Sequence, residues 1–189
     1  MTRLLALFCL STLACQGAPE KRAERREAIA SSSQRTSPAP SLYTRATLEK
    51  AVHDVLGRLG ASVGILSIEL FPDHARFQVE SQTPGEVVEY VWRAGTVRGP
   101  SRLEIRGKGS LQQNLFLLSS VELDNVPSLV EVARSRVDAE QGVVSRVLIR
   151  RNLPVDENVG MRVYVDSPLR SSHVDADARG RPLDPAKYP

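Results

Sequence analysis

The residues with the clearest metal-binding chemistry lie near the C-terminus, in the segment His173-Val174-Asp175-Ala176-Asp177. Alternate side chains of an extended strand share a face, so these three polar side chains would stand about 7 Å apart from one to the next. That spacing is wide for one ion, and no second cluster of His or Cys completes a zinc site. A polar strand at the exposed face of a sheet explains the pattern better. We therefore predict no metal site and no bound cofactor.

The other histidines and the serines do not suggest a catalytic group. His53 falls off the apolar stripe of a predicted helix, and His74 follows Pro72-Asp73 in a predicted turn. We expect no serine nucleophile on a G-x-S-x-G elbow or in an S-x-x-K motif. We also expect no phosphate-binding glycine loop. These observations favour a protein that is not an enzyme, with a hydrolase whose site is not recognisable from sequence as the alternative.

Tyr90 and Trp92 are the aromatic pair that could anchor a partner. Both fall in a predicted strand at 86–93, on the same face as Val88. Core packing is the ordinary role of such a stripe. If that face were open, the two rings would be the natural contact for another protein. The sequence leaves both interpretations open.

The first fifteen residues, MTRLLALFCLSTLAC, form a short apolar segment behind a single basic residue, Arg3. Its apolar part is about 11 residues long, well short of the roughly 20 that a membrane-spanning helix needs. Length and flanks are typical of a secretory signal peptide, which we place at residues 1–14.

The end of this segment, Thr12-Leu13-Ala14-Cys15, resembles the lipobox of bacterial lipoproteins, although Thr12 stands where Leu is usual. The resemblance implies that Cys15 carries a diacylglyceryl group, and that its new N-terminus is acylated, with palmitate as the expected chain. The other cysteine, Cys9, lies inside the signal peptide, so the mature chain has no disulfide, and lipidation accounts for its lone thiol. By the same resemblance, Gln16 permits export to the outer membrane, because it is not Asp. Ordinary secretory cleavage after Ala18 is the alternative.

Residues 15–41 are predicted to be the lipidated cysteine and a disordered tether, since Ile29 is the one large aliphatic residue between 16 and 41. Residues 1–41 also hold six basic and three acidic residues, and the whole chain has a net charge of +3. The remainder is therefore neutral, with 19 residues of each sign (25 − 6 and 22 − 3). A neutral domain has no charge excess for phosphate, so we expect no nucleic-acid partner.

Apolar periodicity predicts helices at 47–59 and 127–139 and strands at 63–71, 75–80, 86–93, 143–151, 159–166 and 171–178. Two further strands are predicted at 103–108 and 115–123. We expect an antiparallel α+β fold of about eight strands, with both helices on one face of the sheet. The recurring order suggests a duplicated α-β-β-β unit at 42–100 and 127–189, joined by a hairpin at 101–126.

The unit that ends in Val174, Asp175, Ala176, Gly180 and Leu183 is similar to PepSY-type domains, and its tandem form is similar to the beta-lactamase inhibitor family. This resemblance implies a non-catalytic module that binds or inhibits another protein through its sheet. Together with the leader, it predicts an envelope protein held to the outer membrane by its lipid, facing the periplasm or the cell surface. Its expected partner is another envelope macromolecule. A carrier of an apolar ligand is a further alternative.

Overall fold

The computed structural model describes residues 41–60, 62–105, 109–153 and 156–184. They belong to a compact unit that spans Ala39–Pro189. The predicted signal peptide, Cys15 and almost all of the tether lie outside the described residues. None of the helices in the described ranges combines the length and the apolar character needed to cross a bilayer.

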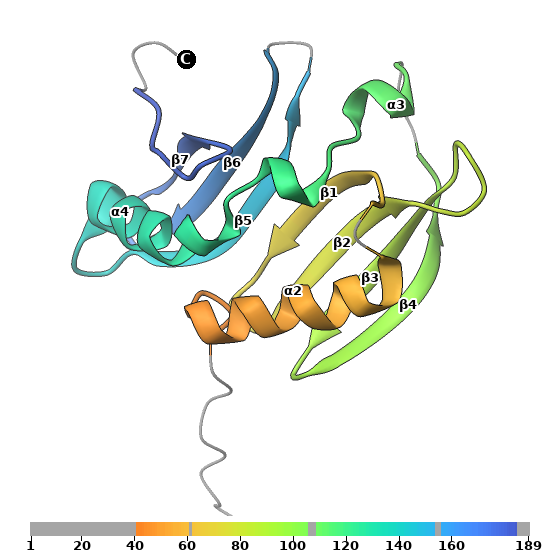
Figure 1. Cartoon of the computed structure of the whole chain (residues 1–189). Helices are drawn as coiled ribbons and strands as arrows, with labels where there is room; N and C mark the ends of the chain where they lie inside the picture. The colour runs from red at the N-terminus through yellow and green to blue at the C-terminus, as the bar shows by residue number, and fades with distance from the viewer. Residues whose placement is uncertain (1–40, 61, 106–108, 154–155, 185–189) are drawn as a thin grey trace, which may run out of the picture. The chain divides into compact units, whose positions relative to one another are not determined.

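The described residues form two long helices and one antiparallel sheet (Figure 1). The helices are α2 (Arg45–Leu59) and α4 (Val126–Asp138). The seven strands, in chain order, are β1 (Ile65–Leu70), β2 (His74–Glu80), β3 (Val87–Arg93), β4 (Thr96–Leu103), β5 (Val143–Asn152), β6 (Asp156–Asp166) and β7 (Ser171–Asp177). Their order across the sheet is β4-β3-β2-β1-β5-β6-β7. The prediction of an antiparallel α+β fold with helices on one face is confirmed.

The two predicted α-β-β-β units occupy the two halves of this sheet. Helix α2 precedes β1, β2 and β3, and helix α4 precedes β5, β6 and β7. The first strands of the two halves, β1 and β5, pair antiparallel at the centre. The order of one helix and three strands occurs on either side of that central pair, as a duplication would produce, and β4 is an additional strand on the first side. Common ancestry of the halves stays a prediction.

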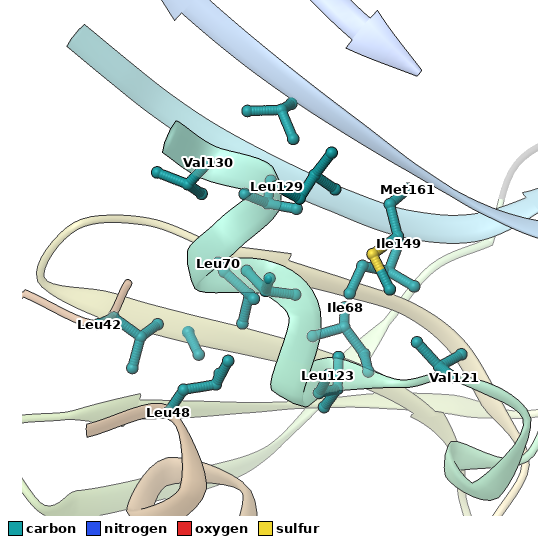
Figure 2. Packing of buried hydrophobic residues seen from close by; sticks show 14 of the residues in the cluster. Leu42, Leu48, Ile68, Leu70, Val121, Leu123, Leu129, Val130, Ile149 and Met161 are labelled. Atoms are coloured by element: carbon teal, nitrogen blue, oxygen red, sulfur yellow. The ribbon is translucent and has the colours of Figure 1, made fainter. Parts of the chain in front are cut away.

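One row of side chains across all seven strands explains why the helices cover a single face. Register pairs the residues of this row from strand to strand, and every one of them is buried: Val97, Trp92, Ala75, Leu70, Val147, Val163 and Val174. Leu48, Ala51 and Val55 of α2 and Leu129, Val130 and Ala133 of α4 are buried in the same cluster. Figure 2 shows Leu48, Leu129 and Val130 among these buried side chains. Apolar residues repeat every second position in the strands and about every 3.6 positions in the helices, so each element has one apolar side, and these sides are buried against one another.

Two predicted strands differ from the structure. Between Leu115 and Leu123 the chain makes one bridge, Phe116 to Ile65, and the 3₁₀ turn Leu118–Ser120, followed by a second at Leu123–Asn125. The apolar residues of this segment do enter the core, but through turns that lead into α4. The strand predicted at 103–108 lies instead at β4, and residues 106–108 are outside the described ranges. The connecting hairpin at 101–126 is therefore absent from its described part.

Strand β4 contains Gly99 and Pro100, residues that ordinarily indicate a turn. It is nevertheless a strand because it lies at the edge of the sheet, where proline removes no hydrogen bond to a further strand.

Candidate functional site

The face of the sheet opposite the helices, called here the open face, carries a row of mostly charged side chains. From β4 to β7 the register pairs Arg98, Val91, Arg76, Glu69, Leu148, Arg162 and Asp175. Each of these residues precedes or follows a member of the buried row by one position. Because successive side chains of a strand point to opposite faces, this second row points away from α2 and α4. The open face is thus a broad polar surface on a buried support.

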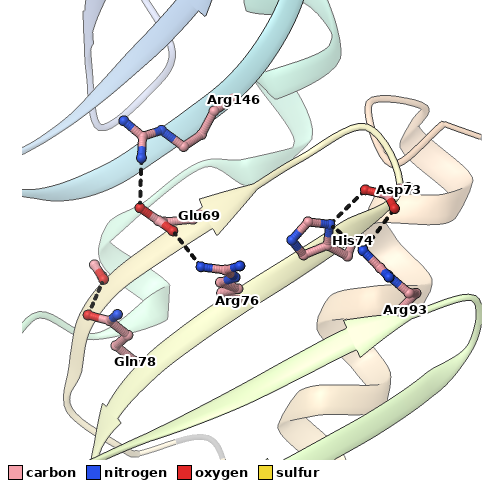
Figure 3. A network of polar contacts seen from close by, with 8 residues as sticks. Glu69, Asp73, His74, Arg76, Gln78, Arg93 and Arg146 are labelled. Carbon is pink, nitrogen blue, oxygen red and sulfur yellow. Dashed lines mark hydrogen bonds and ion pairs between the residues drawn. The ribbon is translucent and has the colours of Figure 1, made fainter. Parts of the chain in front are cut away.

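Glu69 of β1 is the centre of an ion network on this face (Figure 3). Its carboxylate accepts a hydrogen bond of 3.2 Å from Nη1 of Arg146 on β5, and it pairs at 4.0 Å with Nη1 of Arg76 on β2. The guanidinium of Arg146 lies 4.4 Å from the ring centroid of Tyr164 on β6. These contacts link long side chains from four adjacent strands.

A second polar group lies at the turn between β1 and β2 (Figure 3). Nδ1 of His74 is 2.6 Å from Oδ1 of Asp73, and Arg93 pairs with the other carboxylate oxygen at 2.9 Å. The hydrogen bond from His74 is the main reason why the pKa of Asp73 is lower than usual. The His74 ring also stacks on Phe71 at a centroid distance of 4.3 Å. His74 therefore has a structural role in the turn, as its sequence context predicts.

The segment His173–Asp177 forms β7, and its carboxylates are held by arginines. Asp175 accepts two hydrogen bonds from Arg162 of β6, at 2.7 and 3.0 Å, and these raise the pKa of the Arg162 guanidinium. Nε2 of His173 lies 3.7 Å from Oδ2 of the same Asp175, within ion-pair distance. Within the described residues there is no group of three His, Cys, Asp or Glu side chains placed to hold a metal ion.

Asp177 is engaged in a different way. Its carboxylate accepts hydrogen bonds from the backbone N–H groups of Arg179 and Arg181 and from the Arg181 side chain. Burial by itself would raise the pKa of Asp177, but these hydrogen bonds outweigh it and leave the pKa below its ordinary value. The carboxylate thus remains ionised at neutral pH, where it organises the turn after β7.

The structure separates the aromatic pair of β3. Trp92 is only 4% exposed, and its indole N–H donates a hydrogen bond of 2.8 Å to Oδ2 of Asp54 on α2. That hydrogen bond, followed by one from Lys50, lowers the pKa of Asp54. Tyr90 shares the helix-covered face but is half-buried. Trp92 therefore belongs to the core. A role of the pair in partner binding stays a prediction, and of the two residues only Tyr90 is exposed enough to contact a partner.

Tyr90 borders a cleft of about 780 Å³ between the end of α2, the β2–β3 turn and β4. Leu59, Val63, Val88 and Pro100 line it, but so do the polar residues Arg58, Glu80, Gln82 and Thr83. A carrier of apolar ligands would need a more uniformly apolar lining. This mixed lining does not favour the carrier alternative.

A second cleft, of about 550 Å³, lies at the far end of β5, β6 and β7. On the open face it surrounds Gly160 of β6, which pairs with Arg150 of β5 on one side and Asp177 of β7 on the other. Leu148, Arg162 and Asp175 also line it. Sequence analysis missed this site, because only the register brings Arg150 and Gly160 together. The sequence signal that could have indicated it is the spacing of Arg146, Leu148 and Arg150, which places all three side chains on one face of a strand.

The spacing of a serine nucleophile elbow does occur, at Gly60-Ala61-Ser62-Val63-Gly64, contrary to the expectation above. The elbow needs a strand that turns sharply into a helix, and here the segment leads from helix α2 into strand β1. Ala61 lies outside the described residues. Ser62 makes no hydrogen bond to any histidine in the described part of the chain, so the spacing alone carries no catalytic meaning.

No protein-family model matches the chain, and no curated protein matches it. Among solved structures it is similar to a protein of Clostridium difficile 630 described as a "putative lipoprotein", at 13% identity and a TM-score of 0.45. The similarity covers 72% of this chain and 90% of that one. A likeness at this level supports no conclusion about function.

Proposed function

We propose that this chain is an exported, lipid-anchored protein of the bacterial envelope whose α+β domain binds another protein through the open face of its sheet, without catalysis. The observation that carries the proposal is the row from Arg98 to Asp175, which crosses all seven strands on the face opposite α2 and α4. A sheet that needed only to be stable would not require so many arginines there.

The open face has the chemistry of a protein interface. Arginine and tyrosine are enriched at interfaces, where their long or flat side chains provide area and hydrogen bonds together. Arg146 and Arg162 are already held by Glu69 and Asp175, so they would lose little conformational freedom on binding. A preorganised polar surface of this kind favours specific recognition.

The titratable groups do not favour acid–base catalysis on this face. The hydrogen bonds that lower the pKa of Asp73 and Asp177 keep both carboxylates ionised near neutral pH, so neither is a ready proton donor, and the lowered pKa also makes each a weaker proton acceptor. Both are also engaged by cationic side chains, Arg93 and Arg181 respectively. Their geometry serves the conformation of two turns.

The sequence supports the anchor and the location. The lipobox-like Thr12-Leu13-Ala14-Cys15 would place a lipid at the start of a polar tether. Several acyl chains on one cysteine are enough for stable membrane attachment. Gln16 is compatible with the outer membrane as destination. The partner would then be a protein within reach of that membrane.

A matched pair of substitutions tests the proposal. Leu148→Glu alters the centre of the open face, where Arg146, Arg150 and Arg162 surround the new charge. Val132→Glu makes the same kind of change on the outer surface of α4, where Val132 is 39% exposed. Affinity capture from envelope extracts should lose a specific protein with Leu148→Glu and retain it with Val132→Glu. Equal capture by both variants would refute binding through the open face.

A further inference from the structure

We propose that the cleft around Gly160 takes one acidic side chain of the protein partner, and that Arg150 pairs with its carboxylate. The inference rests on the proposed function, because it names the chemistry that one part of the open face recognises. Three observations carry it: a glycine within a row of polar residues, an arginine without a partner among the described residues, and the charge balance of the cleft.

The glycine is Gly160, which leaves a gap between its polar neighbours. The row next to the charged one pairs Ser101, Glu89, Gln78, Ser67, Arg150, Gly160 and Asp177 across the sheet. Gly160 does not have a positive φ, and a Cβ added to it would lie 3.4 Å from the Ala176 carbonyl oxygen, an ordinary contact. Neither backbone conformation nor crowding therefore demands glycine at this position. A glycine inside a strand often marks close approach of a ligand or another backbone.

Arg150 stands beside this gap, and its guanidinium is free. Five arginines line the cleft, and four of them have partners. Arg162 and Arg181 pair with Asp175 and Asp177, Arg179 pairs with Glu122, and Arg151 donates to the backbone oxygens of Leu115 and Glu157. Arg150 is exposed and makes no ion pair or hydrogen bond to any residue that the structure describes.

The charge balance selects a carboxylate. The lining holds five arginines and three acidic residues, Glu157, Asp175 and Asp177, and Arg179 is paired with Glu122 outside it. One positive charge therefore remains, and Arg150 is the arginine without a partner among the described residues. A single carboxylate matches that charge and can meet the planar guanidinium through two parallel hydrogen bonds. A doubly charged phosphate would be repelled more strongly by the two aspartates. Leu148, half-buried in the lining and two positions before Arg150 on β5, can pack against the methylene groups of a glutamate.

Titration of the mature chain tests the site directly, with Cys15→Ser to keep the protein free of lipid. The probe is the peptide acetyl-Ala-Glu-Ala amide, and acetyl-Ala-Gln-Ala amide and inorganic phosphate are the comparisons. We expect the NMR signals of the Gly160 amide and the Arg150 Nε–H to shift saturably with the glutamate peptide. Arg150→Gln should weaken binding about tenfold, the loss expected for a charge-assisted hydrogen bond.

The sheet offers a matched control in Arg98, which is also exposed and has no partner in the described residues. It lies on the same face but on edge strand β4, four strands from β5, or about 19 Å. Arg98→Gln should leave peptide binding unchanged. Gly160→Val should fill the gap and abolish binding while the melting temperature stays near that of the parent chain.

Several results would overturn the inference: equal losses with Arg150→Gln and Arg98→Gln, equal binding of the glutamine peptide, tighter binding of phosphate, or no saturable shift. The titration uses no cellular partner, so its outcome is independent of the capture experiment. Peptide binding at Arg150 together with equal capture by Leu148→Glu and Val132→Glu would support the carboxylate site and refute partner binding through the open face. Selective capture without peptide binding would support partner binding and refute the carboxylate site.

Discussion

The indole N–H of Trp92 and the carboxylate of Asp54 are 2.8 Å apart, and their hydrogen bond joins strand β3 to helix α2. The same carboxylate also accepts hydrogen bonds from Lys50, at 3.0 and 3.1 Å, one turn earlier on the helix. One aspartate therefore ties the outer surface of the helix to the aromatic core beneath it.

This relationship predicts an acid-sensitive contribution to stability. The pKa of Asp54 is lowered in the folded chain, so its stabilising contribution is complete above the unfolded value of about 3.9 and is lost as the pH falls through the folded value. Asp54→Asn should therefore flatten the fall of the unfolding midpoint between about pH 5 and pH 2. Trp92→Phe should flatten part of it, because it removes the largest cause of the shift. An unchanged pH profile in Asp54→Asn would contradict this account.

The ion network of Glu69 should contribute modestly to stability, because its arginine partners are partly exposed. We expect a double-mutant cycle between Glu69→Gln and Arg146→Gln, followed by urea unfolding, to give a coupling of about 0.5–1 kcal/mol. The pair of Arg102 and Glu86 has a shorter distance, 2.7 Å, but its arginine is 76% exposed, and we expect its coupling to be close to zero. A larger coupling for the exposed pair would be inconsistent with screening by solvent.

The two faces of the sheet should respond differently to truncation. Leu70 is fully buried on central strand β1, so Leu70→Ala should cost about 2–5 kcal/mol of unfolding free energy. Leu148 lies on the neighbouring strand but on the open face and is half-buried, so Leu148→Ala should cost no more than about 1–1.5 kcal/mol. Chemical denaturation measures both. Comparable costs would mean that something covers the open face.

The lipid anchor has its own test. Cys15→Ser removes the thiol that would carry the diacylglyceryl group, so the protein should move from the membrane fraction to the soluble periplasmic fraction. Cys9→Ser, inside the signal peptide, is the control and should leave fractionation unchanged. Membrane fractionation that persists in Cys15→Ser would rule out the anchor.

The sequence predicted the fold well where one apolar period dominated. Alternation in β6, through Met161, Val163 and Val165, and helical spacing in α2, through Leu48, Ala51 and Val55, are local signals that burial reinforces. The sequence did not predict β4, because Gly99 and Pro100 ordinarily indicate a turn. At the edge of a sheet a strand can nevertheless contain them. The apolar run around Phe116 suggested a strand, although tertiary packing buries it through turns.

The candidate site depended on information that the sequence does not display. Arg150 and Gly160 are ten positions apart, and they become neighbours only through the register of β5 and β6. Which arginines are free depends likewise on pairs such as Arg162 with Asp175, which cross strands. The sequence did indicate a polar strand at His173–Asp177, but it could not show which arginines pair with its carboxylates.

Site-specific photo-crosslinking in living cells tests the central claim, binding through the open face, most directly. A photoreactive amino acid would replace Leu148 on the open face or, separately, Val132 on the outer surface of α4. The account predicts one discrete crosslinked protein from position 148 and none from position 132. Crosslinks from position 132 alone, or from neither position, would contradict it.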